Sequence, residues 1–511
     1  MMYLPLKAVW EITFACNMHC RHCGSRCGCS KPDELSESEA LDLCDQMGEL
    51  GMAAVTLSGG EPLLRPDWDK IAARLTAAGV TPNVLTNGWY IDEEIIDRAM
   101  EAGIPNFGIS IDGLKKTHDF IRCPGSFDRI MNALELLNKK NIPISIITSI
   151  SRLNQSQLPQ MKELFTRMNV YSWQLQIALP MGNQADYRQW VVRPEHIRKI
   201  IDFAYDAANE GNIVIDLGDC LGYYHSKEVE IRKKYASNPE SDGLWHGCPA
   251  GKLTFGVRCN GDITACNSLR DTDARYIEGN IREKTLSEIW NAPDAFVLNR
   301  TMTKDKLSGF CGKCRYGRLC LGGCTSLKET MTGANTYNPY CLYYIAAQQD
   351  ISEIKKMTDL GLLLELAQND IQKENYQRAE LYLERAHHLK SSDTGILDAL
   401  GFVHYQLDNP QVCYQMNIES LRLDPENAYA HKGLGIALAA LGKVDEGVAA
   451  LEKAIQLADD DFTDPFHDLA VILLQNNRPH QALEVLEKGR NKSLLFARRT
   501  EKLFRQIKKK L

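Results

Sequence analysis

The sequence lacks the features of secreted and membrane-spanning proteins. None of its apolar runs reaches the roughly 18 residues that a spanning helix needs, and its first residues do not form the charged, apolar and small-residue regions of a signal peptide. It also lacks a charge surplus, because the formal net charge is -7 over 511 residues, which gives no general attraction to nucleic acid or anionic lipid. We therefore expect a cytoplasmic protein that binds neither nucleic acid nor a membrane.

Cysteine, in contrast, is abundant, with 17 residues. Cytosolic reductants keep thiols free, so clustered cysteines in such a chain indicate metal binding rather than disulfides. The content of 44% hydrophobic and 24% charged residues is typical of a globular protein, and a chain of this length is too long for one hydrophobic core. We expect about two to four domains that include iron or zinc sites.

The chain from residue 8 to about 210 alternates short β-branched runs with amphipathic helical segments. Strands are expected at residues 8–14, 53–58, 82–86, 106–111, 143–150 and 172–178. Ser36 and Ser126 are the expected N-caps of two of the helices. Six such βα units predict a parallel sheet, either open or a partial barrel, and the loops after the strands' carboxyl ends then form the ligand-binding face.

Three cysteines follow the first expected strand. Cys16, Cys20 and Cys23 have the spacing C-x3-C-x2-C, and three thiolates on one loop can hold three corners of a cubane iron-sulfur cluster while the fourth iron stays open to a ligand. A zinc site normally has four protein ligands, and Cys27 would complete one only if the chain doubled back. The spacing therefore favours iron over zinc.

Two more loops on the same expected face carry polar or flexible residues. These candidate ligand-binding residues are Gly59, Gly60, Glu61, Pro62, Ser110 and Asp112. The two glycines allow the backbone to approach a ligand closely, and the glutamate offers a carboxylate to an ammonium group. The serine and the aspartate are candidates for contacts with ribose hydroxyls. Each motif alone is weak, but their shared face makes the combination specific.

On these motifs the sequence resembles the radical S-adenosylmethionine (SAM) superfamily over roughly residues 5 to 210. The resemblance implies a partial (β/α)6 barrel of the TIM type in residues 1–215 and a [4Fe-4S] cluster on Cys16, Cys20 and Cys23. It also implies that SAM binds the open iron and is cleaved to a 5'-deoxyadenosyl radical. That radical abstracts unactivated hydrogen atoms, which no side chain does unaided.

The same resemblance implies contacts to SAM. The backbone around Gly59, Gly60, Glu61 and Pro62 would hold the methionine amine. Ser110 and Asp112 would lie near the ribose or the methionyl end. His22, between the second and third cysteines, would lie against the adenine.

Residues from about 216 to 345 lose the βα periodicity and carry a second group of cysteines. Their spacing is C-x12-G-x4-C, then C-x2-C-x5-C-x3-C, then a last cysteine, which resembles the SPASM domain of radical SAM enzymes that modify peptides or proteins. For residues 216–350 the resemblance implies two auxiliary [4Fe-4S] clusters; zinc knuckles are the alternative. The implied ligands are Cys248, Cys266 and Cys324 for the first, and Cys311, Cys314, Cys320 and Cys341 for the second.

The first auxiliary set has only three cysteines, so its fourth iron is open or is bound by Cys220 or Cys259. Residues 253–266 predict a β-hairpin closed by an Asn-Gly turn, in which Cys259 would pair with Asp262. Cys266 would then lie about 13 Å further along the strand at ~3.3 Å per residue. Cys220 or an open site is therefore preferred, and Cys259 is expected to be a packed thiol.

Residues from about 359 to 490 form helices that repeat every 34 or 35 residues. Small residues recur in register, for example at Ala379, Cys413 and Gly447, and the pattern resembles about four tetratricopeptide (TPR) repeats. We expect an all-α array in residues 356–511 that ends in a basic capping helix. Such arrays form grooves that hold peptides; a dimerisation or stability module is the alternative.

Together, these resemblances imply a radical SAM maturase that modifies a ribosomally synthesised precursor peptide. A cross-link is favoured over epimerisation or backbone excision. The peptide would be bound by the TPR array or by a separate leader-binding protein, because the chain begins only a few residues before its first strand. The electron donor would be of the flavodoxin or ferredoxin type.

Three side chains bear on the reaction. Cys123 and Cys220 are candidate hydrogen-atom donors, with simple packing as the alternative. Asn267 stands where sulfatase-maturing members of the group carry an aspartate base, which argues against formylglycine formation.

Two other functions stay open. One is the oxidation of a small cofactor precursor such as a tetrapyrrole. The other is a non-catalytic, metal-bearing TPR scaffold, which would bind zinc and would not turn over SAM. The enzyme would instead carry about twelve irons in three cubane clusters.

Overall fold

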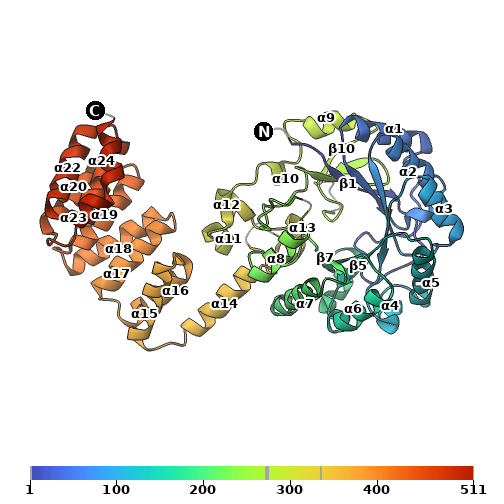
Figure 1. The fold of residues 1–511 in the computed structure, drawn as a ribbon, viewed down its shortest axis with the longest axis horizontal. Coiled ribbons are helices and arrows are strands. Elements are labelled where there is room, and N and C mark those ends of the chain that lie inside the picture. Colours follow the sequence, from blue (N-terminus) through green and yellow to red (C-terminus); the bar gives the residue numbers. More distant parts are fainter. Residues whose placement is uncertain (1–2, 237, 271–274, 334–336, 510) are drawn as a thin grey trace. The chain divides into compact units, whose positions relative to one another are not determined.

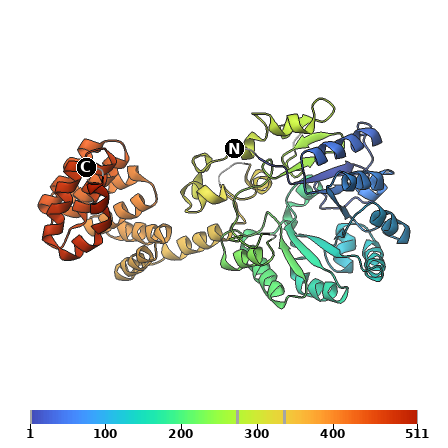
Figure 2. The same cartoon turned by 45° about the horizontal axis from the view of Figure 1, so that its top comes forward.

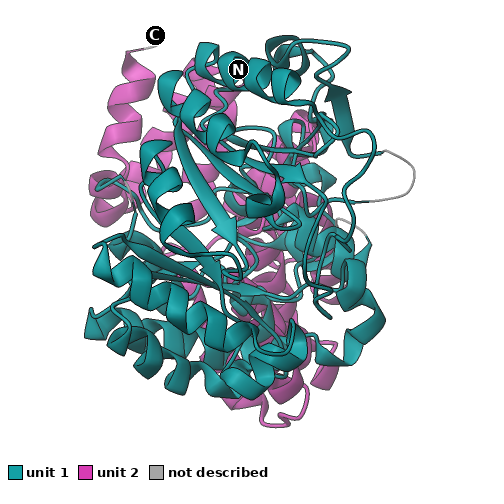
Figure 3. Cartoon of the chain, turned by 90° about the vertical axis from the view of Figure 1, so that its right-hand side faces the viewer, with its two compact units in different colours: residues 1–346 teal, residues 347–511 magenta. Residues whose placement is uncertain are grey.

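The structure is a computed structural model that describes residues 3–236, 238–270, 275–333, 337–509 and 511. It divides into two compact units, Met1–Ala346 and Ala347–Leu511, which Figure 3 colours separately. Within the described residues, no helix is both long enough and apolar enough to cross a membrane.

The first unit is built on a ten-stranded sheet with the order β10-β9-β8-β1-β2-β3-β4-β5-β6-β7 (Figure 1). Its first seven strands are parallel to their neighbours. They are β1 (Lys7–Thr13), β2 (Ala54–Gly59), β3 (Thr81–Thr86), β4 (Phe107–Ser110), β5 (Ile144–Ile150), β6 (Ser172–Ile177) and β7 (Val214–Leu217). The predicted parallel α/β fold is confirmed, and all six expected strands are present.

Helices alternate with these strands and lie along the outer side of the sheet (Figures 1 and 2). They are α1 (Glu37–Glu49), α2 (Trp68–Ala77), α3 (Glu93–Glu101), α4 (Lys115–Ile121), α5 (Ser126–Lys139), α6 (Leu158–Arg167), α7 (Ile197–Glu210) and α8 (Ser226–Lys234). Side chains of β5 alternate between buried and half-buried positions, as the pleat of a strand requires. The core between sheet and helices includes Trp10, Trp68 and Trp173, each almost fully buried.

The two predicted helix caps have different outcomes. Ser36 is the N-cap of α1, and its hydroxyl and the Glu39 carboxylate form a capping box. The predicted cap Ser126 is wrong by one position, because the N-cap of α5 is Gly125, with φ +81°. The Asp119 carboxylate accepts hydrogen bonds from the Gly125 and Phe127 N–H groups at 3.0 and 2.9 Å, so a side chain from the preceding helix caps α5.

The sheet continues without a break into the cysteine-rich region. Strand β8 (Thr254–Val257) pairs parallel with β1. Strands β9 (Asp262–Thr264) and β10 (Ile277–Asn280) follow in antiparallel order. The expected domain boundary between residues 215 and 216 therefore falls inside β7.

The predicted hairpin in residues 253–266 is confirmed, but its turn is longer than expected. The Arg258 N–H donates to the Asp262 carbonyl at 2.9 Å, which leaves a three-residue loop of Cys259, Asn260 and Gly261. Gly261 has φ +88°, the left-handed conformation that three-residue hairpin loops need. The expected pairing of Cys259 with Asp262 is therefore wrong.

Short helices follow the hairpin strands in the first unit. They are α9 (Leu286–Asn291), α10 (Val297–Arg300), α11 (Gly309–Lys313), α12 (Gly317–Cys320) and α13 (Thr325–Thr332), followed by α14 (Leu342–Ile354). The 3-10 helices are η1 (Pro62–Leu64), η2 (Gln155–Gln157), η3 (Gly182–Trp190), η4 (Pro194–His196) and η5 (Lys304–Lys306).

The second unit is helical throughout its described length after α14. Its helix pairs are α15 (Leu360–Gln372) with α16 (Tyr376–Leu389), α17 (Thr394–Gln406) with α18 (Pro410–Leu423), α19 (Ala428–Ala440) with α20 (Val444–Leu457), and α21 (Asp464–Gln475) with α22 (Pro479–Lys492). Helices α23 (Leu494–Arg499) and α24 (Glu501–Lys508) complete it. The recurring positions Ala379, Cys413 and Gly447 are buried. Helix pairs with this spacing agree with the expected all-α array, and its assignment to the TPR class stays a prediction.

Candidate metal centres and SAM site

The first three cysteines lie on the loop between β1 and α1. The Cys16 N–H donates to the Gly28 carbonyl at 2.7 Å and the Gly28 N–H donates to the Phe14 carbonyl at 3.1 Å, so the loop is closed at its base. The chain therefore does double back, and the Cys27 thiol lies near the Cys23 thiol, which lowers the pKa of Cys23.

The surroundings of these thiols fit an iron-sulfur cluster. Burial raises the pKa of Cys20 to about 12, the nearby Cys23 and Cys16 thiols add to this, and the Arg122 guanidinium opposes it. The backbone N–H of Met18 points at the Cys16 sulfur. Hydrogen bonds to sulfur and a nearby cation are features that tune such clusters.

The described residues do not form a site for a single metal ion. Among residues 3–236, 238–270, 275–333, 337–509 and 511, no three His, Cys, Asp or Glu side chains lie close enough together to hold one metal ion. The thiolates of a cubane cluster each bind a different iron, so they lie farther apart than the ligands of one ion.

The glycines after β2 serve a close approach between backbones. A Cβ at Gly59, whose φ is +139°, would lie 2.3 Å from the Thr13 carbonyl oxygen, and one at Gly60 would lie 2.1 Å from the Ala15 carbonyl oxygen. The Gly60 N–H donates to the Thr13 carbonyl at 2.9 Å, and the Glu61 N–H to the Ala15 carbonyl at 2.8 Å. These glycines therefore fix the start of the cysteine loop, and the N–H groups of residues 60 and 61 are already used.

The expectation that the Glu61 carboxylate meets a ligand's ammonium group does not match its position. Glu61 is fully buried at the N-cap of η1, followed by the buried Pro62. Its carboxylate accepts hydrogen bonds from the Thr86 hydroxyl at 2.6 Å and from the Asn87 N–H at 2.8 Å. Asn87 in turn donates its side-chain amide to Asn17 in the cysteine loop at 2.8 Å. Glu61 is therefore a positioning group for that loop.

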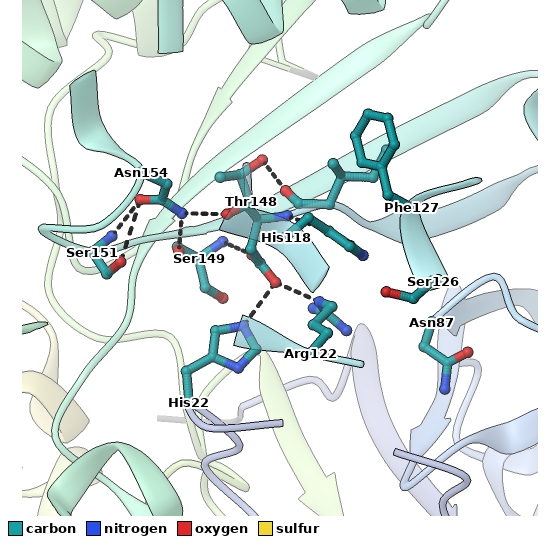
Figure 4. A network of polar contacts seen from close by, with 12 residues as sticks. His22, Asn87, His118, Arg122, Ser126, Phe127, Thr148, Ser149, Ser151 and Asn154 are labelled. Carbon is teal, nitrogen blue, oxygen red and sulfur yellow. Dashed lines mark hydrogen bonds and ion pairs between the residues drawn. The ribbon is translucent and has the colours of Figure 1, made fainter. Parts of the chain in front are cut away.

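Asp112 is likewise turned inward rather than toward a ribose. It is fully buried, and its carboxylate accepts from His22 Nε2 at 2.7 Å, from Arg122 Nε at 2.5 Å and from the Ser149 N–H at 2.7 Å. Burial alone would raise the pKa of Asp112, but the Arg122 guanidinium and the His22 imidazole hold it well below its usual range. Figure 4 shows His22, Arg122 and Ser149 converging in this network.

The His22 imidazole is thus tied by its edge to the end of β4, and its predicted place against an adenine stays a prediction. Asn154 extends the network, because its amide donates to the Asp112 and Ser149 carbonyls at 3.0 Å each (Figure 4). Ser110, the last residue of β4, is half-buried beside this network.

Arg122 and Asn154 were not predicted from the sequence. Arg122 stands ten positions after Asp112, at the end of α4, and a basic residue directly after a helix on the ligand face is the signal that could have identified it. Asn154 has no comparable signal, because it becomes relevant only when β4 and β5 lie side by side.

The later cysteines form two electrostatic groups. Burial raises the pKa of Cys320 to about 12, with the Cys311 and Cys314 thiols as the next causes; Cys341 is raised well above its usual range by burial, with these same thiols contributing. Burial also raises the pKa of Cys266 to about 11, and the Cys248 thiol adds to this. The implied ligands of each auxiliary cluster therefore lie near one another.

The remaining singled-out residues lie elsewhere. Cys123 is half-buried beside Pro124. Asn267 donates its amide to the carbonyls of Val9 at 2.9 Å and Val257 at 3.3 Å. It thereby joins β1 to β8 as a structural bridge.

A cavity of about 490 Å³ adjoins the cysteine loop. The Arg21 guanidinium lies over the Phe120 ring at 4.5 Å and donates to the Phe120 carbonyl at 3.0 Å. Asn183 holds the loop beside the cavity, with its amide on the Cys20 carbonyl at 2.9 Å. The cavity is lined by His19, Arg21, Asp119, Phe120, Arg122, Pro124, Asn183, Asp186 and Tyr187.

A thiol-bearing loop at the carboxyl end of the first strand of a parallel sheet, followed by a second cysteine region, defines an iron-sulfur protein with a partial α/β barrel. Sequence comparison agrees: the radical SAM superfamily matches residues 10–165, and the SPASM iron-sulfur cluster-binding domain matches residues 248–315.

Individual proteins with similar sequences support the same family assignment. The AdoMet-dependent heme synthase of Methanosarcina barkeri is 30% identical over 347 residues, which cover 66% of this chain and 97% of that protein. The mycofactocin maturase MftC of Mycobacterium tuberculosis is 29% identical over 331 residues, covering 63% and 79%. The chain belongs to the radical SAM superfamily and is a SAM-dependent enzyme.

Solved structures share the fold. The crystal structure of Streptococcus suis SuiB bound to S-adenosylmethionine has a TM-score of 0.54 at 16% identity, over 67% of this chain and 78% of that one. This likeness shows a shared fold, and the two family matches confirm the predicted radical SAM and SPASM resemblances.

Proposed function

We propose that this chain is a radical SAM maturase that modifies a ribosomally synthesised precursor peptide, with a cross-link as the favoured product and epimerisation or backbone excision as the other possible products. The observation that carries the proposal is the cysteine loop with an adjoining cavity, in a chain that also bears the SPASM cysteines. The name of MftC, a maturase, supports the peptide class. The domains proposed are the barrel (1–215), the SPASM domain (216–350) and the TPR array (356–511).

The residues of this chain have distinct roles in the proposal. Cys16, Cys20 and Cys23 hold the first of three [4Fe-4S] clusters. A reduced cluster with bound SAM supplies a 5'-deoxyadenosyl radical that abstracts a hydrogen atom from the substrate. The backbone around Gly59, Gly60, Glu61 and Pro62 borders the methionine amine, and Ser110 and Asp112 lie near the ribose or the methionyl end. The Glu61 and Asp112 carboxylates also hold the cysteine loop, through Asn87 and His22.

The cavity beside the loop is the proposed position of the substrate's reacting segment. Its wall combines the Arg21 guanidinium with the Phe120 and Tyr187 rings, and Tyr187 stacks on Trp190 at 4.1 Å. This wall suits a segment that carries both a planar side chain and an acidic group. The helical second unit is the proposed groove for the rest of the peptide, with a separate leader-binding protein as the other possible partner, and a flavodoxin or ferredoxin supplies electrons.

The test uses the anaerobically purified full chain, reductant and SAM, and measures 5'-deoxyadenosine. Changing Cys16, Cys20 and Cys23 together to Ala is expected to abolish 5'-deoxyadenosine formation while about eight irons stay in the later region. Cys29→Ala, an exposed cysteine just after the loop, is the matched control and keeps the activity. SAM cleavage by the triple variant would contradict the role of these three cysteines. Zinc in place of iron, with no SAM cleavage by the wild-type chain, would contradict the proposal and favour the scaffold.

A second candidate function is the oxidation of a tetrapyrrole, which the similarity to the heme synthase over 97% of that protein favours. The two are separated by adding either a candidate precursor peptide, taken from any short reading frame found beside the gene, or an iron tetrapyrrole to the same reaction. Consumption of peptide, seen as a mass change, supports the maturase. Loss of mass from the tetrapyrrole, with no change in the peptide, would contradict the maturase proposal and support tetrapyrrole oxidation.

A further inference from the structure

A fourth thiol, that of Cys220, lies near Cys324, one of the three cysteines implied for the first auxiliary cluster. Cys220 follows β7 and is buried, and its sulfur accepts the Ile177 N–H at 3.2 Å. Hydrogen bonds from backbone N–H groups to ligand sulfurs are a regular feature of iron-sulfur sites.

One tyrosine joins the segment of Cys220 to that of Cys324. The Tyr223 hydroxyl donates to the Asp219 carbonyl, and the Cys324 N–H donates to the same hydroxyl oxygen at 3.1 Å. The approach is close, because a Cβ on Gly323 would lie 3.1 Å from the Tyr223 ring. Tyr223 has φ +124°, a conformation that non-glycine residues keep only where the surroundings impose it. Residues 219–220 and 324 are therefore held on either side of one hydroxyl group.

A buried asparagine joins the segment of Cys248 to that of Cys324. The Asn299 amide lies 3.9 Å from the Cys248 sulfur, and its carbonyl accepts the Thr325 hydroxyl at 2.7 Å. Electrostatics agree with this convergence: burial raises the pKa of Cys324 well above its usual range, and the thiols of Cys248 and Cys220 are the next causes.

Cys259 has different neighbours. Burial raises its pKa to about 11, and the charged groups that act on it most strongly after burial are Glu34 and Lys31, from the segment before α1. The Cys259 carbonyl accepts the Leu35 N–H at 2.8 Å. This cysteine therefore belongs to the packing between the hairpin loop and the start of α1.

We infer that Cys220, after losing its thiol proton to solvent, is the fourth protein ligand of the first auxiliary [4Fe-4S] cluster. The inference rests on the proposed function for the presence of that cluster. A thiolate bound to iron has no hydrogen atom to transfer, so Cys220 is then no hydrogen donor, and of the two candidate donors only Cys123 is left.

The test is made in the full chain with Cys16, Cys20 and Cys23 changed to Ala, so that only auxiliary clusters contribute. Cys220→Ala, Cys220→Ser and the matched control Cys259→Ala are compared by iron content, Mössbauer spectra and electron paramagnetic resonance after reduction, with and without cyanide. The parent is expected to hold about eight irons with spectra that cyanide does not change.

Cys220→Ala is expected either to fall to about four irons or to keep its iron and gain a cyanide-dependent signal, while Cys259→Ala matches the parent. Cys220→Ser preserves the side-chain volume and is expected to shift the signal without loss of fold. Identical iron content and spectra for the Cys220 variants and Cys259→Ala would overturn the inference. A parent without iron would instead contradict the auxiliary clusters of the proposed function.

Discussion

The two cysteine regions of the first unit are built in opposite ways. Cys16, Cys20 and Cys23 come from one short loop, closed at its base by backbone hydrogen bonds. The later cysteines come from turns and short helices between residues 248 and 341. The cysteines of the first region are brought together by one local loop, whereas those of the second come together only because distant segments converge.

Each region also contains a largely buried cation close to its cysteines, and these two cations differ in their partners. Arg122 is paired with the fully buried Asp112. Lys328 is 1% exposed, its Nζ donates to the Leu321 carbonyl at 3.3 Å, and in the described part of the chain no carboxylate pairs with it. Four thiols from both auxiliary groups act on it instead, and burial is the main reason that its pKa is lowered. In the first region the charge of Arg122 is therefore balanced by the Asp112 carboxylate. In the second region the groups of opposite charge nearest to Lys328 are the cysteine thiols, once these are deprotonated.

The largest effect on stability is expected from breaking the ion pair between Arg122 and Asp112. Asp112→Asn leaves the Arg122 guanidinium buried without a counter-ion, which lowers the free energy of unfolding by about 3–5 kcal/mol. Because the folded-state pKa of Asp112 is lowered, its contribution is present above the pKa of an unfolded aspartate and is lost as the pH falls. Denaturant unfolding at pH 7 and at a pH below about 3, where an unfolded aspartate is protonated, measures this; Asp128→Asn, which removes the exposed Lys115 partner, is the control. Equal stability of both variants would contradict the pair's role.

A smaller effect is expected at Glu61, on the β2 side of the same loop. Glu61→Gln places an amide against the Asn87 N–H and leaves a buried donor unpaired, at a cost of about 1–3 kcal/mol at pH 5. Burial raises the pKa of Glu61 from 4.5 to about 7, so the wild-type protein loses stability as the pH rises between these values, whereas the variant does not.

The deficit of the Gln variant is therefore expected to shrink between pH 5 and pH 8. The exposed Glu101→Gln serves as the control, since its stability should follow the wild type at every pH. A constant deficit would mean that Glu61 is ionised throughout.

The smallest effect in free energy is expected at Lys328, in the second cysteine region. Lys328→Met removes a positive charge near both auxiliary groups, so their reduction potentials are expected to become more negative, on the order of tens of millivolts. The potential of the first cluster is expected to stay unchanged. Redox titration followed by electron paramagnetic resonance measures both, and an equal shift at all three clusters would show that Lys328 does not act locally.

The sequence predicted the strands and the cysteine loop well because both are encoded locally, by alternation of apolar residues and by spacing. It failed where a side chain's partner is remote. The place of Glu61 and Asp112 beside a ligand stays a prediction, but the sequence did not show that donors at the ends of β3, β5 and α4 bind their carboxylates. Ser126 was displaced as a cap by Asp119 from the preceding helix. The hairpin was predicted correctly, and its turn was one residue too short because Gly261 allows a left-handed position.

The continuous sheet has a mechanical consequence. Strand β1 ends where the cysteine loop begins, and it is paired with β2 on one side and with β8 on the other. Four residue pairs between β1 and β8, with Asn267 bridging both strands, resist any sliding of one region past the other. The distance between the cysteine loop and the hairpin of the second cysteine region is therefore fixed by the backbone hydrogen bonds of one sheet. If both regions hold clusters as proposed, an electron would cross the same distance between them in every turnover.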